Sequence, residues 1–258
     1  MKKQKNQNKS YKSISRLESI VLTNLKENDF AVFSLKDAVR VTKMKRTQIY
    51  NILFSLNKKG IVLRAKKDCY IIKDEIHGRE FEISTRIFVP SYISFWSALS
   101  FYGFTEQQPN VIQLASTYQF APIDLKLLRI RVIRVISKRF FGYKRLGSFN
   151  IAEKEKALVD SLSHLSAIGG IKEFSKCLSN SWNEIDHNMF VDYLLRFENK
   201  SIISRAGFLI EKLGLEIRES LIKKMSLKIS KGFVPLDPLK KNVMGYNKKW
   251  KIIENVIL

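Results

Sequence analysis

The hydrophobic residues between Ser34 and Gly60 recur at helical spacing and predict two consecutive helices. Ser34 stands where a side chain can cap the first helix, and Asp37 follows at the third helical position, as in a capping box. The second helix has an apolar stripe at i, i+3, i+4 and i+7, made of Ile49, Ile52, Leu53 and Leu56. Gly60 follows the last turn, where a left-handed residue often ends a helix.

Apolar runs on both sides of this helix pair extend the pattern. Residues 61–64 and 69–72 have the composition of two strands joined by a polar turn, and residues 14–25 repeat at helical spacing. A helix, the helix pair and a β-hairpin then follow one another in the order of a winged helix-turn-helix. We therefore predict such a domain at 12–73, preceded by a disordered basic tail at 1–11.

Ten polar and basic side chains fall on the predicted outer surface of this domain: Lys43, Lys45, Arg46, Thr47, Gln48, Tyr50, Asn51, Arg64, Lys66 and Lys67. Side chains of these types hydrogen-bond base edges and phosphates, and the N-terminus of a recognition helix is where a helix-turn-helix meets the bases. The pattern therefore favours binding of double-stranded DNA. The alternative is a small helical domain whose basic residues only solvate it. Phe54, on the same exposed side, fits DNA binding less well.

The charge balance supports a polyanionic partner. The 258 residues carry 46 Lys and Arg against 24 Asp and Glu, a net charge of +22, and residues 1–80 hold half of it, +11. Such a basic balance is typical of proteins that bind nucleic acid. A competing class is a protein-interaction adaptor whose charge only maintains solubility.

The cysteines and the hydropathy bear on the compartment. Cys69 and Cys177 lie far apart in the sequence and fit a reducing cytosol better than a disulfide scaffold. The first ten residues lack the apolar run of a signal peptide, and no stretch approaches the ~18 apolar residues of a spanning helix. We expect a cytoplasmic protein without membrane contact.

A second domain is expected beyond a linker at 74–88. Residues 89–258 are predicted to form a mixed α/β domain, which makes the fold class α+β overall. The segment Val89–Phe104 is apolar nearly all round and predicts a buried helix at the centre of that domain. Strand composition at 111–117 and 128–136 predicts a small sheet, and later helical patterns predict a helical second half.

Seven basic residues of the second domain lie within 17 positions and suggest a second basic surface: Arg129, Arg131, Arg134, Lys138, Arg139, Lys144 and Arg145. Arginines on an exposed strand can blunt a sheet edge against aggregation. They can equally form a rigid row of phosphate or carboxylate ligands. The sequence leaves both interpretations open.

Signs of catalysis are sparse, so no catalytic residue, metal ligand or cofactor is predicted. The chain has no glycine-rich phosphate loop, and its histidines have no metal-ligand spacing with the cysteines. One enzyme-like alternative remains, a metal-dependent nuclease. Glu153, Lys154 and Glu155 include a Glu-x-Lys sequence after a predicted strand, and Asp124 is a possible upstream carboxylate. Such a sequence arises easily in a lysine-rich chain.

Several segments, spread over nearly the whole chain, also resemble a known family: Lys67-Asp68-Cys69-Tyr70, Tyr92–Pro109, Ile151–Leu162, Ser204–Gly214 and Gly245–Trp250. In this order they resemble the AbiEi-type antitoxins of type IV, abortive-infection toxin–antitoxin systems, also described as viral-defence transcriptional regulators. Tyr92–Pro109 is the most specific of the segments.

This resemblance implies two activities. The N-terminal winged domain would repress its own operon by binding operator DNA with inverted repeats. The C-terminal domain would antagonise a nucleotidyltransferase toxin without forming a stable complex with it. Whether the second basic surface contacts DNA or toxin is not decided by the sequence. Cys69 departs from the family pattern, because such wings often have glycine there. The departure leaves open how tight the wing turn is.

Overall fold

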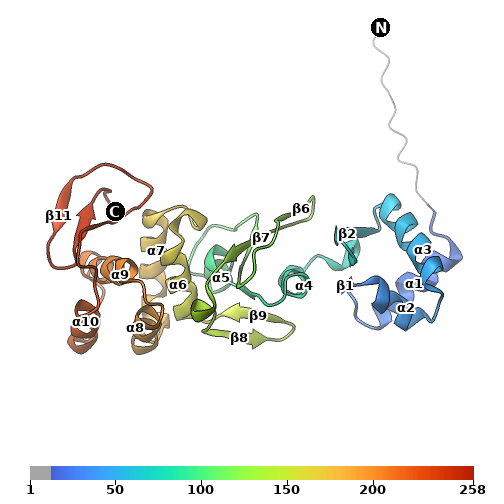
Figure 1. Cartoon of the computed structure of the whole chain (residues 1–258), viewed down its shortest axis with the longest axis horizontal. Coiled ribbons are helices and arrows are strands. Elements are labelled where there is room, and N and C mark those ends of the chain that lie inside the picture. Colours follow the sequence, from blue (N-terminus) through green and yellow to red (C-terminus); the bar gives the residue numbers. More distant parts are fainter. Residues whose placement is uncertain (1–12) are drawn as a thin grey trace, which may run out of the picture. The chain divides into compact units, whose positions relative to one another are not determined.

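The computed structural model describes residues 13–258, which form two compact units that divide between Ile83 and Ser84. The basic tail predicted at 1–11 lies outside the described residues. Both helices and strands occur along the chain, so the expected α+β class is confirmed (Figure 1). Between residues 13 and 258, no helix combines the length and the apolarity needed to cross a membrane.

Between residues 13 and 72, the N-terminal unit contains three α-helices and a three-stranded antiparallel sheet. Its elements are α1 (Arg16–Glu27), β1 (Val32–Phe33), α2 (Leu35–Thr42), α3 (Arg46–Lys59), β2 (Val62–Lys66) and β3 (Cys69–Ile72). The strand order is β1-β3-β2, so that β3 is central. The helices and hairpin strands predicted from the hydrophobic pattern are confirmed, and β1 is an addition.

The predicted local signals act as expected in this unit. Ser34 and Asp37 form a complete capping box at the start of α2, and Gly60 ends α3 with φ of 74°. Lys45 occupies the N-cap of α3 without a side-chain hydrogen bond. The predicted apolar stripe of α3 is buried against residues of α1 and the sheet, among them Val21 and Val62. Tertiary burial therefore compensates for the weak cap of α3.

A buried carboxylate joins α1 to α3. Glu18 is 2% exposed and accepts two hydrogen bonds from Lys59 Nζ, at 2.6 and 2.8 Å, and others from Ser15 and Ser55. Burial alone would raise the pKa of Glu18. The hydrogen bonds from Lys59 and the two serines outweigh that effect and lower the pKa from 4.5 to about 2.

The N-terminal unit should consequently lose stability in acid. A carboxylate with a lowered folded-state pKa stabilises the fold above the unfolded value of 4.5, and this contribution disappears as the pH falls toward 2. We expect Glu18→Gln to lower the unfolding free energy at pH 7 by roughly 2 kcal/mol, allowing for the partial exposure of Lys59. Chemical denaturation between pH 2 and 7 measures this. Equal pH slopes for both proteins would contradict the assignment.

The range 74–88, predicted as a linker, contains the division between the two units at Ile83 and Ser84, but it is ordered and not a structureless connection. It contains most of the 3-10 helix η1 (Lys73–Glu75) and the helix α4 (Glu80–Ile87). Arg79, which precedes α4, forms ion pairs with Glu75, Asp29 and Glu82 at 2.8–3.2 Å. The mixed charges that suggested a solvated linker instead neutralise one another.

The C-terminal unit is built on a six-stranded mixed sheet in the order β6-β7-β5-β4-β9-β8. The strands are β4 (Tyr92–Ile93), β5 (Ile112–Ser116), β6 (Ile123–Leu125), β7 (Leu128–Arg134), β8 (Tyr143–Leu146) and β9 (Phe149–Ala152). The pairs β5–β7 and β4–β9 are parallel, and the other neighbouring strands are antiparallel. The sheet is larger than the small one predicted.

Helices make up most of the remainder of this unit, as predicted. They are α5 (Phe95–Phe101), α6 (Lys154–Ser163), α7 (Ile171–Ser181), α8 (His187–Arg196), α9 (Lys200–Lys212) and α10 (Glu219–Ser226), with 3-10 turns η2 (Ser137–Arg139), η3 (Leu165–Ala167) and η4 (Trp182–Glu184). A second small sheet contains β10 (Val234–Pro235), β11 (Gly245–Asn247) and β12 (Ile252–Glu254) in the order β10-β12-β11.

The apolar segment from Val89 to Phe104 is central, as predicted, but only its second half is helical. Tyr92 and Ile93 form β4, which lies between β5 and β9, and α5 begins after Ser94. A segment that is apolar on all sides carries no periodicity to separate a buried strand from a buried helix. Its burial was therefore predictable and its division was not.

A polar cluster lies inside the C-terminal unit where β4 faces α6. Lys156 and Asp160, one turn apart on α6, form an ion pair with both side chains fully buried. Asp160 Oδ2 accepts hydrogen bonds from the Tyr92 hydroxyl at 3.0 Å and the Ser94 hydroxyl at 2.8 Å. Burial lowers the pKa of Lys156, and the neighbouring carboxylate opposes that shift. Three aromatic rings lie with their centroids 5.0–5.5 Å from the ammonium.

The second small sheet meets α9 through a very close contact. Gly207 of α9 faces the ring of Trp250, which is fully buried. A β-carbon at position 207 would lie 2.1 Å from Cζ3 of that ring, so only glycine fits. The Asn247 side chain accepts a hydrogen bond of 2.9 Å from the Trp250 backbone and helps to hold the ring in place.

Candidate nucleic-acid interface

A groove of about 590 Å³ lies on the N-terminal unit between α3 and the β2–β3 hairpin. Six of the ten residues predicted to contact DNA line it: Arg46, Thr47, Tyr50, Asn51, Arg64 and Lys67. The other four, Lys43, Lys45, Gln48 and Lys66, are not among the lining residues. The hydrophobic period of α3 explains the grouping, because burial of one stripe turns Thr47 and Asn51 outward.

The groove is rich in unused hydrogen-bond donors. Within residues 13–258, no hydrogen bond or ion pair engages the side chains of Arg46, Asn51, Arg64 or Lys67. Tyr50 is 55% exposed, and its ring forms part of the same wall. An amide, two guanidiniums, an ammonium and a phenol on one surface can contact base edges and phosphate oxygens together.

The hairpin turn is tied to the start of α2. Asp68 takes the left-handed conformation, with φ of 53°, and its Oδ1 accepts a 2.9 Å hydrogen bond from the Leu35 backbone. This bond satisfies one of the free N–H groups at a helix N-terminus. Cys69, where a glycine was expected, has ordinary backbone geometry and points inward, and burial raises the pKa of its thiol. The turn of the β2–β3 hairpin, between the paired residues Lys66 and Cys69, is therefore tight without a glycine.

Sequence reasoning missed Asp68 and Tyr70 as parts of this groove. Asp68 belonged to the predicted turn, but its contact with Leu35 spans 33 positions and has no local signal. Tyr70 lies on β3, where all four residues are buried, so alternation along the strand gave no indication of a groove-facing ring.

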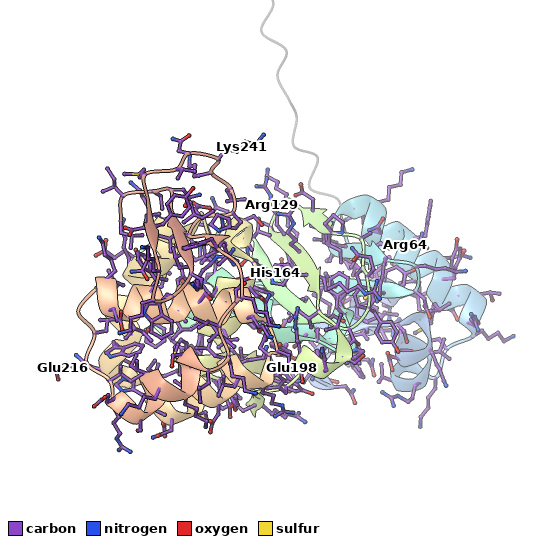
Figure 2. All side chains as sticks on the ribbon, turned by 60° about the vertical axis from the view of Figure 1, so that its left-hand side comes forward. Arg64, Arg129, His164, Glu198, Glu216 and Lys241 are labelled. Atoms are coloured by element: carbon purple, nitrogen blue, oxygen red, sulfur yellow. The ribbon has the colours of Figure 1, made fainter. Side chains whose placement is uncertain are left out.

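The seven basic residues predicted as a second surface do not gather in one place. Strands β7 and β8, which carry Arg129 and Lys144, are separated by β5, β4 and β9, or about 19 Å at the usual strand spacing. Arg134 points to the opposite face of β7 from Arg129, because side chains alternate along a strand. Figure 2 shows Arg129 well apart from Glu198, the ion-pair partner of Lys138.

Internal contacts engage two more members of this set. Arg139 donates a 3.0 Å hydrogen bond to the Phe197 carbonyl, and its guanidinium lies 4.4 Å from the centroid of that ring. Arg145 donates to the Gly147 carbonyl within its own hairpin. The cluster is thus close in sequence and dispersed in space, since the strand order and not the sequence distance decides which residues meet.

The residues considered for a nuclease point to separate partners. Glu153 accepts a hydrogen bond from Tyr193, Lys154 pairs with Glu184 at 2.8 Å, and Glu155 accepts from the Asp186 backbone at 2.8 Å. Asp124 forms an ion pair with Arg129 on β6 and β7, at the opposite edge of the sheet from β8 and β9. Among residues 13–258, no three His, Cys, Asp or Glu side chains are grouped so that they could hold a metal ion. The nuclease constellation is therefore not assembled.

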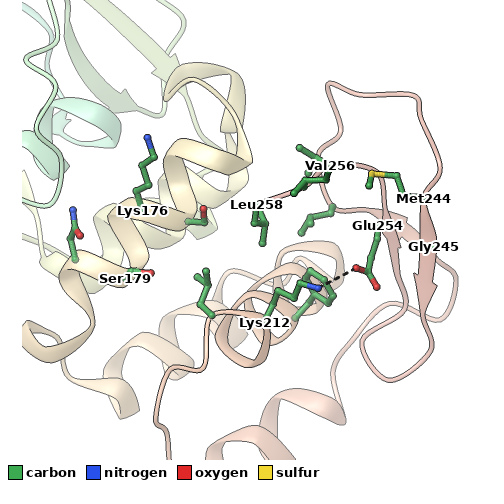
Figure 3. Close-up of a pocket in the computed structure, with 14 residues that line it drawn as sticks. Lys176, Ser179, Lys212, Met244, Gly245, Glu254, Val256 and Leu258 are labelled. Atoms are coloured by element: carbon green, nitrogen blue, oxygen red, sulfur yellow. Dashed lines mark ion pairs between the residues drawn. The ribbon is translucent and has the colours of Figure 1, made fainter.

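Another groove, of about 720 Å³, lies beside α7, α9 and β12 (Figure 3). It contains none of the residues predicted to bind a partner. Its two lysines already have acidic partners, Lys176 with Glu173 at 3.6 Å and Lys212 with Glu254 at 3.8 Å. Leucine and other apolar side chains form much of the remaining wall. The groove is thus less suited to a polyanion than the one beside α3.

Comparisons with known proteins give one informative result. No protein-family model matches the sequence, and no curated protein matches it. The fold is similar to the crystal structure of RV2827C protein from Mycobacterium tuberculosis, with a TM-score of 0.67 and 12% identity, covering 93% of this chain and 92% of that one. Identity at this level shows a shared fold and says nothing about activity.

Proposed function

We propose that the N-terminal unit is a winged helix-turn-helix that binds duplex DNA in a sequence-specific way. The observation that carries the proposal is the groove that combines Arg46, Thr47, Tyr50, Asn51, Arg64 and Lys67. The order α1-β1-α2-α3-β2-β3 is that of a winged helix, with α3 as recognition helix and the β2–β3 hairpin as wing.

Each part of the groove has a distinct task in this proposal. B-DNA admits an α-helix into its major groove, which is about 12 Å wide, and α3 would enter with its N-terminal half. Asn51 can donate to and accept from adenine, and Arg46 can donate two hydrogen bonds to guanine. Arg64 and Lys67, on the wing, would contact phosphates and fix the orientation of α3.

The test separates base contacts from phosphate contacts. On a duplex taken from upstream of its own coding sequence, Asn51→Ala should weaken binding by about 1–3 kcal/mol and have little effect on random DNA. Lys67→Ala should weaken binding to both duplexes and lower the slope of log K against log salt by about one. Fluorescence anisotropy at several salt concentrations measures both effects.

Lys73→Ala is the matched control, because it removes a positive charge that does not line the groove. It should preserve the discrimination between the two duplexes. Equal losses of Asn51→Ala on specific and random DNA would show that α3 does not read bases.

We further propose that the chain is an autorepressor and the antitoxin of a nucleotidyltransferase toxin. This part is supported by the resemblance to AbiEi-type antitoxins. Its segments supply contacts in the core of the C-terminal unit, including Tyr92 with Asp160 and Gly207 with Trp250. The test is co-expression with a nucleotidyltransferase encoded next to the chain's own gene. Growth that is not restored, with the chain present in folded form, would contradict the antitoxin role.

A further inference from the structure

A pocket of about 440 Å³ opens on one face of the C-terminal sheet, over strands β6, β7 and β5. The strand register places its polar residues there. Arg131 pairs with Gln113 across the parallel strands, and Arg129 pairs with Asp124 across the antiparallel ones, so all four side chains share a face. The volume lies within the range of sites for small organic ligands.

The cationic side of the pocket has spare binding capacity. Arg131 is exposed, and within residues 13–258 its guanidinium has no hydrogen-bond or ion-pair partner. Arg129 shares one 3.0 Å contact with Asp124, an exposed carboxylate, and keeps its remaining donors. Residues two apart on one strand are about 7 Å apart, so both guanidiniums can approach the same anionic group.

Edge protection does not account for both arginines. Strand β6 pairs with the outer side of β7 from Leu128 to Ile130, so Arg129 lies on a stretch of β7 that is covered on both sides. Arg131 follows the last residue of β7 that β6 pairs, where an exposed arginine can also keep the open edge from pairing with another chain.

The opposite wall is apolar, aromatic and fixed in position. The Trp96 indole, Val111 and Pro122 are among its lining residues. The Gln113 side chain accepts a 2.8 Å hydrogen bond from the Trp96 backbone and donates one of 2.7 Å to the Ala167 carbonyl. The amide oxygen and the amide nitrogen of Gln113 are thus both used in hydrogen bonds that position this wall. The arginines are therefore the groups that remain to bind an anion.

We propose that this pocket binds a free nucleoside phosphate. Guanidiniums bind phosphate oxygens through two parallel hydrogen bonds, and an indole beside apolar side chains suits a flat heteroaromatic base. A nucleoside phosphate can contact the arginines through its phosphate and the wall with Trp96 through its base. Inorganic phosphate can contact only the arginines, and a nucleoside only the wall with Trp96. This inference is independent of the DNA groove beside α3, which lies in the other unit.

The test titrates the full chain with AMP and GMP and follows tryptophan fluorescence and binding heat. Nucleotide should quench fluorescence, while adenosine and inorganic phosphate should bind at least about tenfold more weakly. Arg131→Gln should lose at least about tenfold in affinity. Trp96→Phe should keep measurable binding heat and lose the quench, since the two other tryptophans, Trp182 and Trp250, do not line the pocket.

Arg145→Gln is the matched control, an exposed arginine on β8 at the other edge of the sheet. It should bind nucleotide like the unchanged chain. Absence of nucleotide binding at millimolar concentration, or equal losses for Arg131→Gln and Arg145→Gln, would overturn the proposal. The proposal would also be overturned if a single-stranded oligonucleotide of about ten nucleotides bound more tightly than AMP or GMP and lost this affinity in Arg131→Gln. The natural ligand of the pocket would then be nucleic acid.

Discussion

Gly207→Ala is expected to lower the unfolding free energy of the C-terminal unit by about 3–5 kcal/mol. The added β-carbon would lie 2.1–2.4 Å from three atoms of the Trp250 ring, far inside van der Waals contact. A shift of a few tenths of an ångström cannot relieve this, so the ring must leave its site. The loss then approaches that of deleting a buried tryptophan side chain. Urea unfolding followed by tryptophan fluorescence measures it, because all three tryptophans lie in this unit.

Gly232→Ala provides the matched control. Gly232 has an ordinary backbone conformation, and a β-carbon there would have no heavy atom within 4 Å. We expect its unfolding free energy to stay within about 0.5 kcal/mol of the unchanged chain. If Gly207→Ala also stayed within 1 kcal/mol, the packing of Trp250 against α9 would have to differ from the one described.

Asp160→Asn should have a comparable effect for a different reason. It leaves the Lys156 ammonium fully buried without its counter-ion, and breaking a buried pair on one side typically costs about 3–5 kcal/mol. The hydroxyls of Tyr92 and Ser94 would also lose a charged acceptor. Denaturant unfolding of the full chain at pH 7 measures the loss.

A second substitution separates two causes of the lost stability, the unpaired buried ammonium of Lys156 and the loss of other contacts made by Asp160. The double variant Lys156→Met, Asp160→Asn removes the uncompensated ammonium and should be more stable than Asp160→Asn alone. Asp192→Asn is the control, since its pair with Lys224 is half exposed and should contribute less than about 1 kcal/mol. A double variant with additive losses would show that Asp160 does not act through Lys156.

The N-terminal unit was the more predictable half of the fold because its signals are local. The capping box at Ser34, the apolar stripe of α3 and Gly60 each depend on residues that lie close together in the sequence. Together they indicate where α2 and α3 begin and end. Arg79 shows the opposite case, because its partner Asp29 lies 50 positions away and turns an apparent linker into structure. Local composition cannot reveal an ion pair of that separation.

The candidate sites also differ in whether local sequence signals could predict them. The hydrophobic period of α3 identified its outward face, because the residues that lie outside the buried stripe of a helix are the exposed ones. The seven basic residues do not form the single surface that was predicted. Arg129 and Lys144 are only 15 positions apart in the sequence, but the strand order of the sheet places them on distant strands. The nucleotide pocket was not predictable from sequence, because it brings Trp96 beside Arg131 through the pairing of β5 with β7.

The contact between Trp250 and α9 has a consequence for how the chain matures during synthesis. The N-terminal unit ends at Ile83, so it can fold while the rest of the chain is still being translated. The C-terminal unit cannot complete its packing against α9 until Trp250 has left the ribosome. At typical elongation rates of about 5–20 residues per second, the delay is roughly 10–30 s. Throughout that interval the groove beside α3 is already formed on a nascent chain whose second half is incomplete.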